Sequence, residues 1–176
     1  MNILEYNSKA WDKLTELNDQ WTLPVNENTI ANARKGDWII QLTSVKPAPR
    51  TWFPEKMEGK NVLCLASGGG QQGPILAAAG AKVTVFDNSE KQLAQDRFVS
   101  ERENLDINTE LGDMADLSRF NDENFDLIVN PVSNVFSENI LPVWQEAARV
   151  LKTGGTLLSG FINPFRFVFD LEDYEN

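Results

Sequence analysis

Residues 61–87 read NVLCLASGGGQQGPILAAAGAKVTVFD, and this stretch decides the fold. The short apolar run Asn61–Leu65 predicts a strand, and the small residues Ser67–Gly70 predict a tight turn after it. A helix is expected over Ile75–Ala79. Pro74 suits its first position, because an N–H group there would have no helical partner.

A second strand completes this unit. Gly80 can end the helix in the left-handed conformation, and Lys82–Phe86 is expected to be the next strand, with Asp87 at its carboxyl end. The glycines of Gly68–Gly73 fit the pattern G-x-G-x-x-G. Asp87 follows Gly68 by 19 residues, close to the roughly 20 expected of an acid that binds ribose hydroxyls. The stretch therefore predicts half of a nucleotide-binding α/β unit.

Charge and composition narrow the chemistry. The chain has a formal charge of −10, which disfavours nucleic acid and anionic membranes as partners. It has no histidine, which excludes Ser–His and Cys–His pairs and most zinc sites, so no metal site is expected. The single cysteine, Cys64, lies in a predicted buried strand and is interpreted as a core residue rather than a nucleophile.

Length and hydropathy predict one structural unit. At 176 residues the chain can form its own core. No stretch approaches the roughly 20 apolar residues that a membrane span needs. The N-terminus lacks the basic and then apolar pattern of a secretory signal. We therefore expect a cytoplasmic protein that does not bind membranes.

The N-terminal third is expected to form a helical cap or lid. Residues 1–55 are assigned to this cap, and residues 56–176 to a Rossmann-like domain. A second short helix is predicted over 28–35, with Gly36 as its end, whereas 37–45 fits a helix or a strand. The residues that suggest one face of the first helix are Tyr6, Trp11, Leu14 and Leu17.

Strands and helices alternate from Asn61 onward. This order predicts an α/β fold, a doubly wound and mostly parallel sheet of about five strands with helices on both faces. Ser89 and Gln92 form a capping box for a helix that runs to about Asn104. A helix over Pro142–Leu151 is expected to stop at Gly154-Gly155. The remaining strands are expected at Ile107–Leu111, Phe125–Val129 and Thr156–Phe161.

Four segments carry a family resemblance: VLCLASGGG, VFDNSEKQLAQDR, GDMADL with FDLIVNPVSNVF, and EAARVLKTGGTLLSG. With them the chain resembles the class I S-adenosylmethionine-dependent methyltransferases, specifically the small-molecule group called type 11. The resemblance runs from about Asn61 to Gly160. It implies S-adenosyl-L-methionine as cofactor, S-adenosyl-L-homocysteine as product, and methyl transfer to an unidentified small molecule.

The resemblance also implies a set of cofactor contacts. Asp87 would hold the ribose hydroxyls, with Asn88 beside the adenine. Met114 suits the apolar face of the adenine and Asp113 its amino donor. The remaining contacts would be to the methionine part, with the last two residues also near the transferred methyl group: Ser67, Gly68, Gly70, Gln72, Asn130 and Val132.

The chain departs from the family pattern at the first turn. The family usually reads Val-Leu-Asp-Leu-Gly-Cys-Gly-x-Gly. Here Cys64 takes the place of the acid, Ala66 that of the first glycine and Ser67 that of the cysteine. The acid normally helps to orient the turn, and Gln71 or Gln72 is interpreted as its substitute at the methionine end.

A second departure concerns the edge of the sheet. The family's sheet normally has seven strands, but only the apolar stretch Phe165–Phe169 and an acidic tail follow the fifth predicted strand. The fifth strand would then be an exposed edge. We expect either a truncated form or a homo-oligomer that covers this edge.

Two other functions fit part of the pattern. An NAD-dependent oxidoreductase would share the glycine turn and Asp87, but it does not explain Gly112–Met114 or Lys152–Gly155. A non-catalytic binding or scaffold domain would use the fold without turnover. No catalytic residue is assigned, and a carboxylate or Tyr6 is a candidate base. The aromatic residues that could line an acceptor pocket or simply pack the cap are Trp11, Trp21, Trp38, Trp52 and Phe53.

Overall fold

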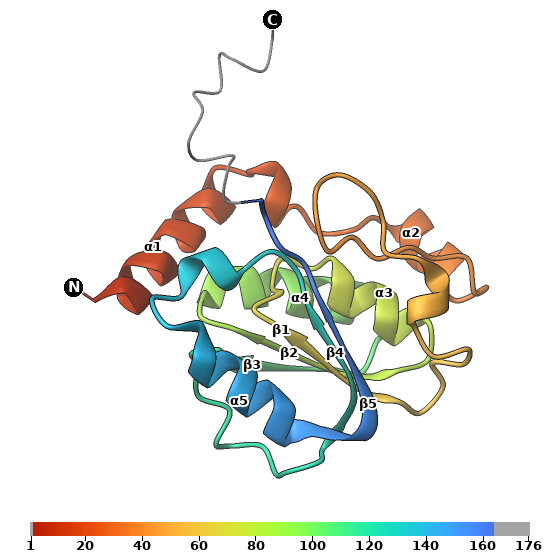
Figure 1. Cartoon of the computed structure of the whole chain (residues 1–176). Coiled ribbons are helices and arrows are strands. Elements are labelled where there is room, and N and C mark those ends of the chain that lie inside the picture. The colour runs from red at the N-terminus through yellow and green to blue at the C-terminus, as the bar shows by residue number, and fades with distance from the viewer. Residues whose placement is uncertain (1, 164–176) are drawn as a thin grey trace, which may run out of the picture.

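The computed structural model describes residues 2–163 (Figure 1). The apolar stretch Phe165–Phe169 and the acidic tail lie outside these residues. Five parallel strands form one sheet in the order β3-β2-β1-β4-β5, which confirms the predicted Rossmann-like fold. The strands are β1 Asn61–Leu65, β2 Lys82–Asp87, β3 Ile107–Leu111, β4 Phe125–Asn130 and β5 Leu151–Ser159.

The order of the strands creates a crevice. The chain builds β1, β2 and β3 in one direction across the sheet and then returns to place β4 on the other side of β1. In such sheets ligands bind at this reversal, beyond the carboxyl ends of the strands. The loops after β1, β2 and β4 therefore border the expected binding region.

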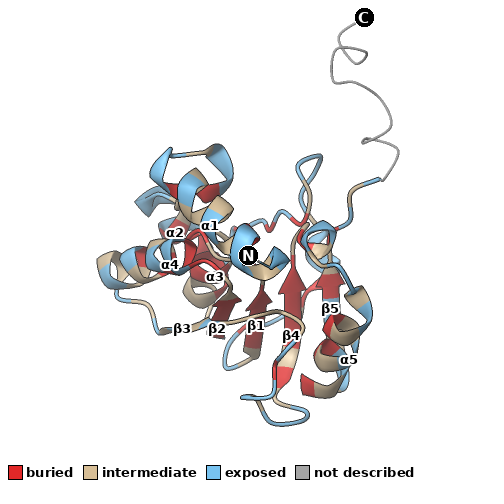
Figure 2. Cartoon of the chain, turned by 90° about the vertical axis from the view of Figure 1, so that its left-hand side faces the viewer, coloured by how far each residue is buried: buried red, intermediate tan, exposed pale blue. Residues whose placement is uncertain are grey.

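Helices cover both faces of the sheet, as expected. Val62 and Cys64 of β1 point into a core with α3, whereas Leu63 and Leu65 point into a core with α5. This alternation follows from the two-residue period of a strand. Figure 2 shows the buried residues concentrated in the central strands. The helices are α1 Ile3–Glu16, α2 Glu27–Ala33, α3 Gln72–Ala78, α4 Glu90–Glu103 and α5 Ile140–Val150.

Several predicted boundaries are wrong, among them those of the second helix, Glu27–Ala33, and of β5, and two of the differences have a clear physical reason. Helix α3 begins at Gln72, so Pro74 occupies its third position rather than its first. Proline is tolerated there because the N–H groups of the first turn have no helical partner. Helix α5 ends at Val150 and β5 begins at once, so Gly154-Gly155 lie inside the strand, where a register shift marks the irregularity.

The N-terminal cap differs in detail from the prediction. Residues 37–45 form neither a helix nor a strand, apart from one isolated bridge between Gln41 and Pro47. In α1 the expected face is not the buried one, because Tyr6 is 55% exposed while Asn7 is buried. The reason is that α1 packs against α4 and lines the cavity, and none of its residues belongs to the two apolar core clusters of the described chain.

Strand β5 is an edge of the described sheet. A homo-oligomer that covers this edge stays a prediction, as does the division of the chain at residue 55.

Candidate functional site

The glycine turn after β1 and the end of β2 meet through one hydrogen bond. The backbone N–H of Gly68 donates to Asp87 Oδ2 at 2.9 Å, and the N–H of Ser89 donates to Oδ1 at 3.0 Å. Burial raises the pKa of Asp87, and these backbone hydrogen bonds act against that rise. An added Cβ on Gly68 would lie 2.7 Å from Gln92 Cβ, so only glycine allows this approach.

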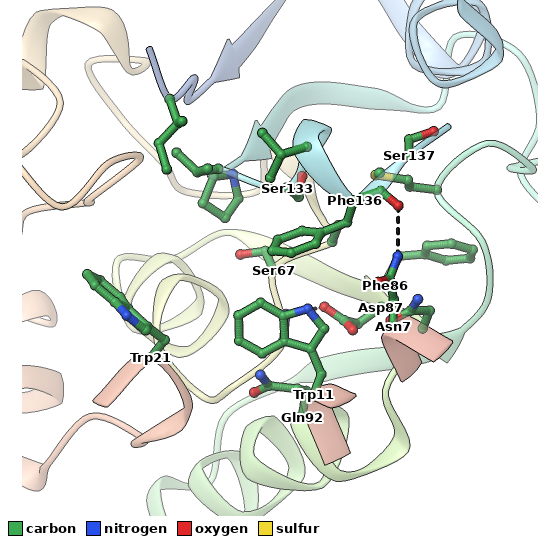
Figure 3. Close-up of a pocket in the computed structure, with 18 of the residues that line it drawn as sticks. Asn7, Trp11, Trp21, Ser67, Phe86, Asp87, Gln92, Ser133, Phe136 and Ser137 are labelled. Atoms are coloured by element: carbon green, nitrogen blue, oxygen red, sulfur yellow. Dashed lines mark hydrogen bonds between the residues drawn. The ribbon is translucent and has the colours of Figure 1, made fainter. Parts of the chain in front are cut away.

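A cavity of about 970 Å³ opens beside this contact (Figure 3). Its walls come from the loops after β1, β2, β3 and β4, from α1, and from residues 41–45. Figure 3 shows the indole of Trp11 beside the carboxylate of Asp87 among the side chains that line it. Such a volume is in the range of small-molecule and cofactor sites.

Eight of the ten predicted cofactor residues line this cavity. They come from four separate loops, which explains why the sequence shows them as scattered positions. These residues are Ser67, Gly68, Gln72, Asp87, Asn88, Asp113, Met114 and Val132. The structure therefore brings most of the predicted site together.

Gly70 and Asn130 do not line the cavity that the described residues form. Asn130 is fully buried and uses its amide to join strand ends, donating to Leu65 O at 2.9 Å and to Ser133 Oγ at 2.7 Å. Gly70 faces the cap instead, where its carbonyl accepts from the N–H of Val25 at 2.9 Å. Both residues therefore support the loops around the cavity without lining the cavity themselves.

The two glutamines of the turn are already engaged. Gln72 accepts from Ser67 Oγ at 3.2 Å and donates to Gln41 O at 3.1 Å. Gln71 donates to Leu23 O at 3.0 Å. Both line the cavity, and both also fasten the cap to the turn.

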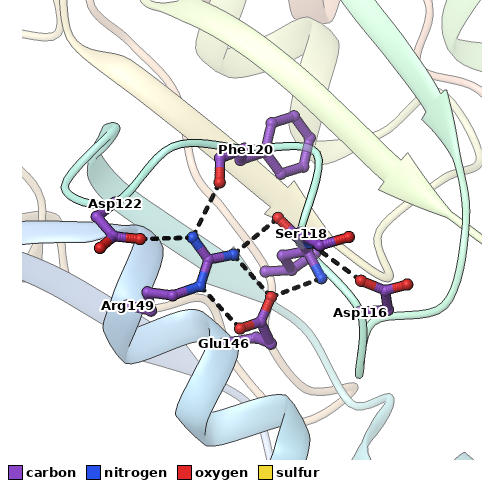
Figure 4. Close-up of polar contacts among 7 residues, drawn as sticks. Asp116, Ser118, Phe120, Asp122, Glu146 and Arg149 are labelled. Atoms are coloured by element: carbon purple, nitrogen blue, oxygen red, sulfur yellow. Dashed lines mark hydrogen bonds and ion pairs between the residues drawn. The ribbon is translucent and has the colours of Figure 1, made fainter.

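The loop after β3 is held in place by α5. Asp113 Oδ1 accepts from the N–H of Ala115 at 2.9 Å, which fixes the local turn that presents Met114. Farther along, Arg149 donates to the carbonyls of Leu117 and Phe120, both at 2.9 Å (Figure 4). This network anchors the base of the loop that carries the predicted adenine contacts.

Helix α1 bridges two sides of the cavity mouth. Asp12 Oδ1 accepts from Ser89 Oγ at 2.6 Å and from the N–H of Lys91 at 3.1 Å, at the start of α4. On the other side, Asn7 donates to Phe136 O at 2.8 Å, and Trp11 packs edge-on against Phe136 with ring centroids 5.6 Å apart. The cap is therefore fastened over the site.

The predicted aromatic residues have three different surroundings. Trp11 and Trp21 line the cavity. Trp38 and Phe53 pack against each other in the core, with ring centroids 5.2 Å apart. The exposed Trp52, like Tyr6, is not among the described lining residues, so the geometry gives Tyr6 no role as a base.

Asp96 was not among the predicted site residues. It is fully buried in α4, and its Oδ2 accepts from the N–H of Gly69 at 3.0 Å. The spacing of Leu93, Asp96 and Val99 places all three on one helix face, and this was the available signal. Phe98, by contrast, is exposed.

A family model for a methyltransferase domain, Methyltransf_11, matches residues 63–159, more than half of the chain. The chain belongs to this methyltransferase family. The matched residues include the glycine turn, Asp87 and the loop after β3, which line the cavity, whereas α1 and residues 41–45 line it from outside the matched region.

This methyltransferase domain has relatives of known sequence and structure. It is 60% identical over 170 residues to the "Uncharacterized methyltransferase YbaJ" of Bacillus subtilis (strain 168), covering 97% of this chain and 66% of YbaJ. The chain thus spans slightly less than two thirds of that relative.

Two solved structures share the fold. The PH0226 protein from Pyrococcus horikoshii OT3 is 30% identical with a TM-score of 0.57, covering 65% of this chain and 50% of that one. The protein mmp1179 from Methanococcus maripaludis, a provisionally assigned S-adenosyl-L-methionine-dependent methyltransferase, has a TM-score of 0.58 at 17% identity. It covers 92% of this chain and 65% of that one, and at this identity it supports the fold alone.

In the described part of this methyltransferase domain, no helix is long and apolar enough to cross a membrane. The cytoplasmic location and the absence of nucleic-acid partners stay predictions.

Proposed function

We propose that the chain binds S-adenosyl-L-methionine in the cavity and transfers its methyl group to a neutral or cationic small molecule. The contact between Gly68 and Asp87 carries this proposal, because it places a carboxylate and a close-fitting backbone turn at the reversal of strand order. Membership of the methyltransferase family supports it.

The residues around the cavity fit an adenosyl group. Each Asp87 oxygen accepts one backbone N–H, and a carboxylate oxygen can accept a second hydrogen bond, here from a ribose hydroxyl. Met114 offers apolar surface to a flat base. At about 970 Å³ the cavity is large enough to admit a small acceptor beside the cofactor.

When bound, S-adenosyl-L-methionine supplies a methyl group already activated as a sulfonium. The chain's own residues then have to orient the acceptor and exclude water. Trp11 and Phe136 form an aromatic wall at the mouth, and the hydrogen bond from Asn7 to Phe136 O links α1 to this wall. This arrangement requires no histidine.

The charge of the cavity limits the acceptor. The described residues that line it include no lysine or arginine. They include three carboxylates, those of Asp87, Asp113 and Glu138. An anionic acceptor would lack a cationic partner and meet like charge, whereas a neutral or cationic one would not.

Binding and turnover test the proposal together. Calorimetry with S-adenosyl-L-homocysteine is expected to show saturable binding, and NAD is expected to show none. A screen of amines and neutral hydroxyl compounds with methyl-labelled S-adenosyl-L-methionine is expected to yield a labelled product. Binding of NAD alone would contradict the proposal, and cofactor binding without transfer to any acceptor would favour a non-catalytic domain.

A further inference from the structure

The buried carboxylate of Asp96 binds the Gly68–Gly70 turn from the side that does not face the cavity. It is 0% exposed, lies outside the described cavity lining, and reaches the turn from α4. The carboxylate accepts from the N–H of Gly69 at 3.0 Å. The adjacent N–H, that of Gly68, is held by Asp87. Two carboxylates from separate elements thus fix successive amides of one turn.

This carboxylate is buried at a cost. Its Oδ1 has no hydrogen-bond partner among the described residues and lies 3.2 Å from where a Cβ on Gly73 would be. Burial raises the pKa of Asp96 to about 8, and the nearby Asp87 adds to the rise. A buried acid that is only half satisfied destabilises a fold, and acids with strongly shifted pKa values cluster at functional sites.

Asp96 also lies near the position where the sequence departs from its family pattern. Cys64 stands where the family usually has an acid in the first strand. Burial raises the pKa of the Cys64 thiol, and the charge of Asp96 adds to the rise. The carboxylate that the strand lacks is therefore present nearby, supplied by α4.

We infer that Asp96 is a positioning residue for cofactor binding, which orders the Gly68–Gly70 turn in place of an acid at position 64. The inference rests on the proposed function, because the ordered turn is the one expected to hold S-adenosyl-L-methionine. Asp96 does not touch the cavity, so it acts through the backbone amides and not on the ligand directly.

The test compares two variants of α4 by calorimetry with S-adenosyl-L-homocysteine and by urea unfolding. Asp96→Asn keeps the shape but removes the charge that the carboxylate carries above its pKa of about 8, and at about pH 9 it is expected to weaken binding about tenfold, or about 1.4 kcal/mol. Val99→Ala opens a cavity at another buried position of the same helix and is expected to lose stability without losing affinity. Wild-type affinity in Asp96→Asn, or an equal loss of affinity in Val99→Ala, would overturn the inference.

Moving the acid provides a rescue experiment. Asp96→Ala is expected to bind the same ligand weakly, and the double variant Cys64→Asp/Asp96→Ala is expected to recover most of the affinity. A double variant that binds no better than Asp96→Ala would show that the carboxylate has no positional equivalent in β1. If the wild-type chain itself does not bind S-adenosyl-L-homocysteine, the proposed function fails instead, so the two failures are distinguishable.

Discussion

Asp87 is the residue on which recognition of the cofactor depends most. Replacing it by alanine removes both carboxylate oxygens from the cavity wall and leaves the N–H of Gly68 without its acceptor. We expect Asp87→Ala to weaken binding of S-adenosyl-L-homocysteine by about 1–3 kcal/mol in calorimetry, the range for hydrogen bonds to a charged group. Asp106→Asn, which removes the same charge at an exposed position, is the control. Unchanged affinity in Asp87→Ala would contradict the ribose assignment.

Ala66 is strained by its backbone. It has a φ of +48°, in the left-handed region that favours glycine. Its position is the one at which the family usually carries glycine, so the structure explains that preference. We expect Ala66→Gly to raise the free energy of unfolding by up to about 1 kcal/mol in urea titrations. A loss of about 1 kcal/mol or more would show that the strain is absent.

Among the elements, the connection between α5 and the loop after β3 depends on Arg149. Its guanidinium donates to the carbonyls of Leu117 and Phe120 and pairs with Glu146 (Figure 4). Arg149→Met keeps the aliphatic stem but leaves these carbonyls without their donor. We expect the melting temperature to fall by about 5 °C. Lys9→Ala, which removes an exposed ion pair, should change it little. Equal effects of the two variants would contradict the anchoring role.

Gly160 directly follows β5 and lies against the backbone of Leu42 in the N-terminal cap. A Cβ at this position would lie 2.1 Å from the carbonyl oxygen of Leu42, and that oxygen also accepts from the N–H of Val132. Because the neighbour is backbone, Gly160→Ala should destabilise the fold by about 3 kcal/mol or more in urea titrations. Gly59→Ala has open space around it and should cost only about 1–2 kcal/mol for its positive φ. If Gly160→Ala destabilised the fold no more than Gly59→Ala, the backbone near Leu42 would have to move to admit the added Cβ.

Local patterns predicted the sheet well because strands and caps depend on neighbouring residues. The bounds of β1 and β3 agree with the prediction, and Ser89 caps α4 as expected. The prediction that Gly154-Gly155 ends α5 was wrong. These glycines are typical of a helix end by composition, but in the structure they lie at an irregularity of β5. The segment 37–45 was undecidable because its conformation depends on contacts with Gln72 and Val132, far along the chain.

The candidate site was predictable only where a motif marks it. Asp87 and the glycine turn follow from spacing, whereas the commitment of Asn130 to strand ends depends on Leu65 and Ser133, which only the fold brings near. Asp96 was missed because a carboxylate in a charged helix reads as solvent-exposed. The apolar positions on either side of it indicate otherwise.

At the scale of the whole molecule, the buried Asp96 should make stability depend on pH. Its folded-state pKa of about 8 exceeds its ordinary value of 3.8, so the folded chain retains a proton that the unfolded chain releases between these values. Stability should therefore fall as pH rises from about 5 to 8, by up to about 1.4 kcal/mol per pH unit for this group. The charges that face it are those of Asp87 and Arg97, with Cys64 beside it.

Urea titrations at several pH values measure this dependence. Asp96→Asn should flatten the slope by about one proton, and the remaining slope should reflect Asp87, whose pKa is also raised. A slope that is the same in the wild-type chain and in Asp96→Asn would mean that Asp96 is ionised in the folded state throughout this range.

The most direct measurement is an experimental structure of the chain with S-adenosyl-L-homocysteine. The adenosyl group is expected between the Gly68 turn and Met114, with both ribose hydroxyls on the Asp87 carboxylate and Trp11 over the site. An adenosyl group bound elsewhere, or a turn filled by the chain's own side chains, would contradict the account.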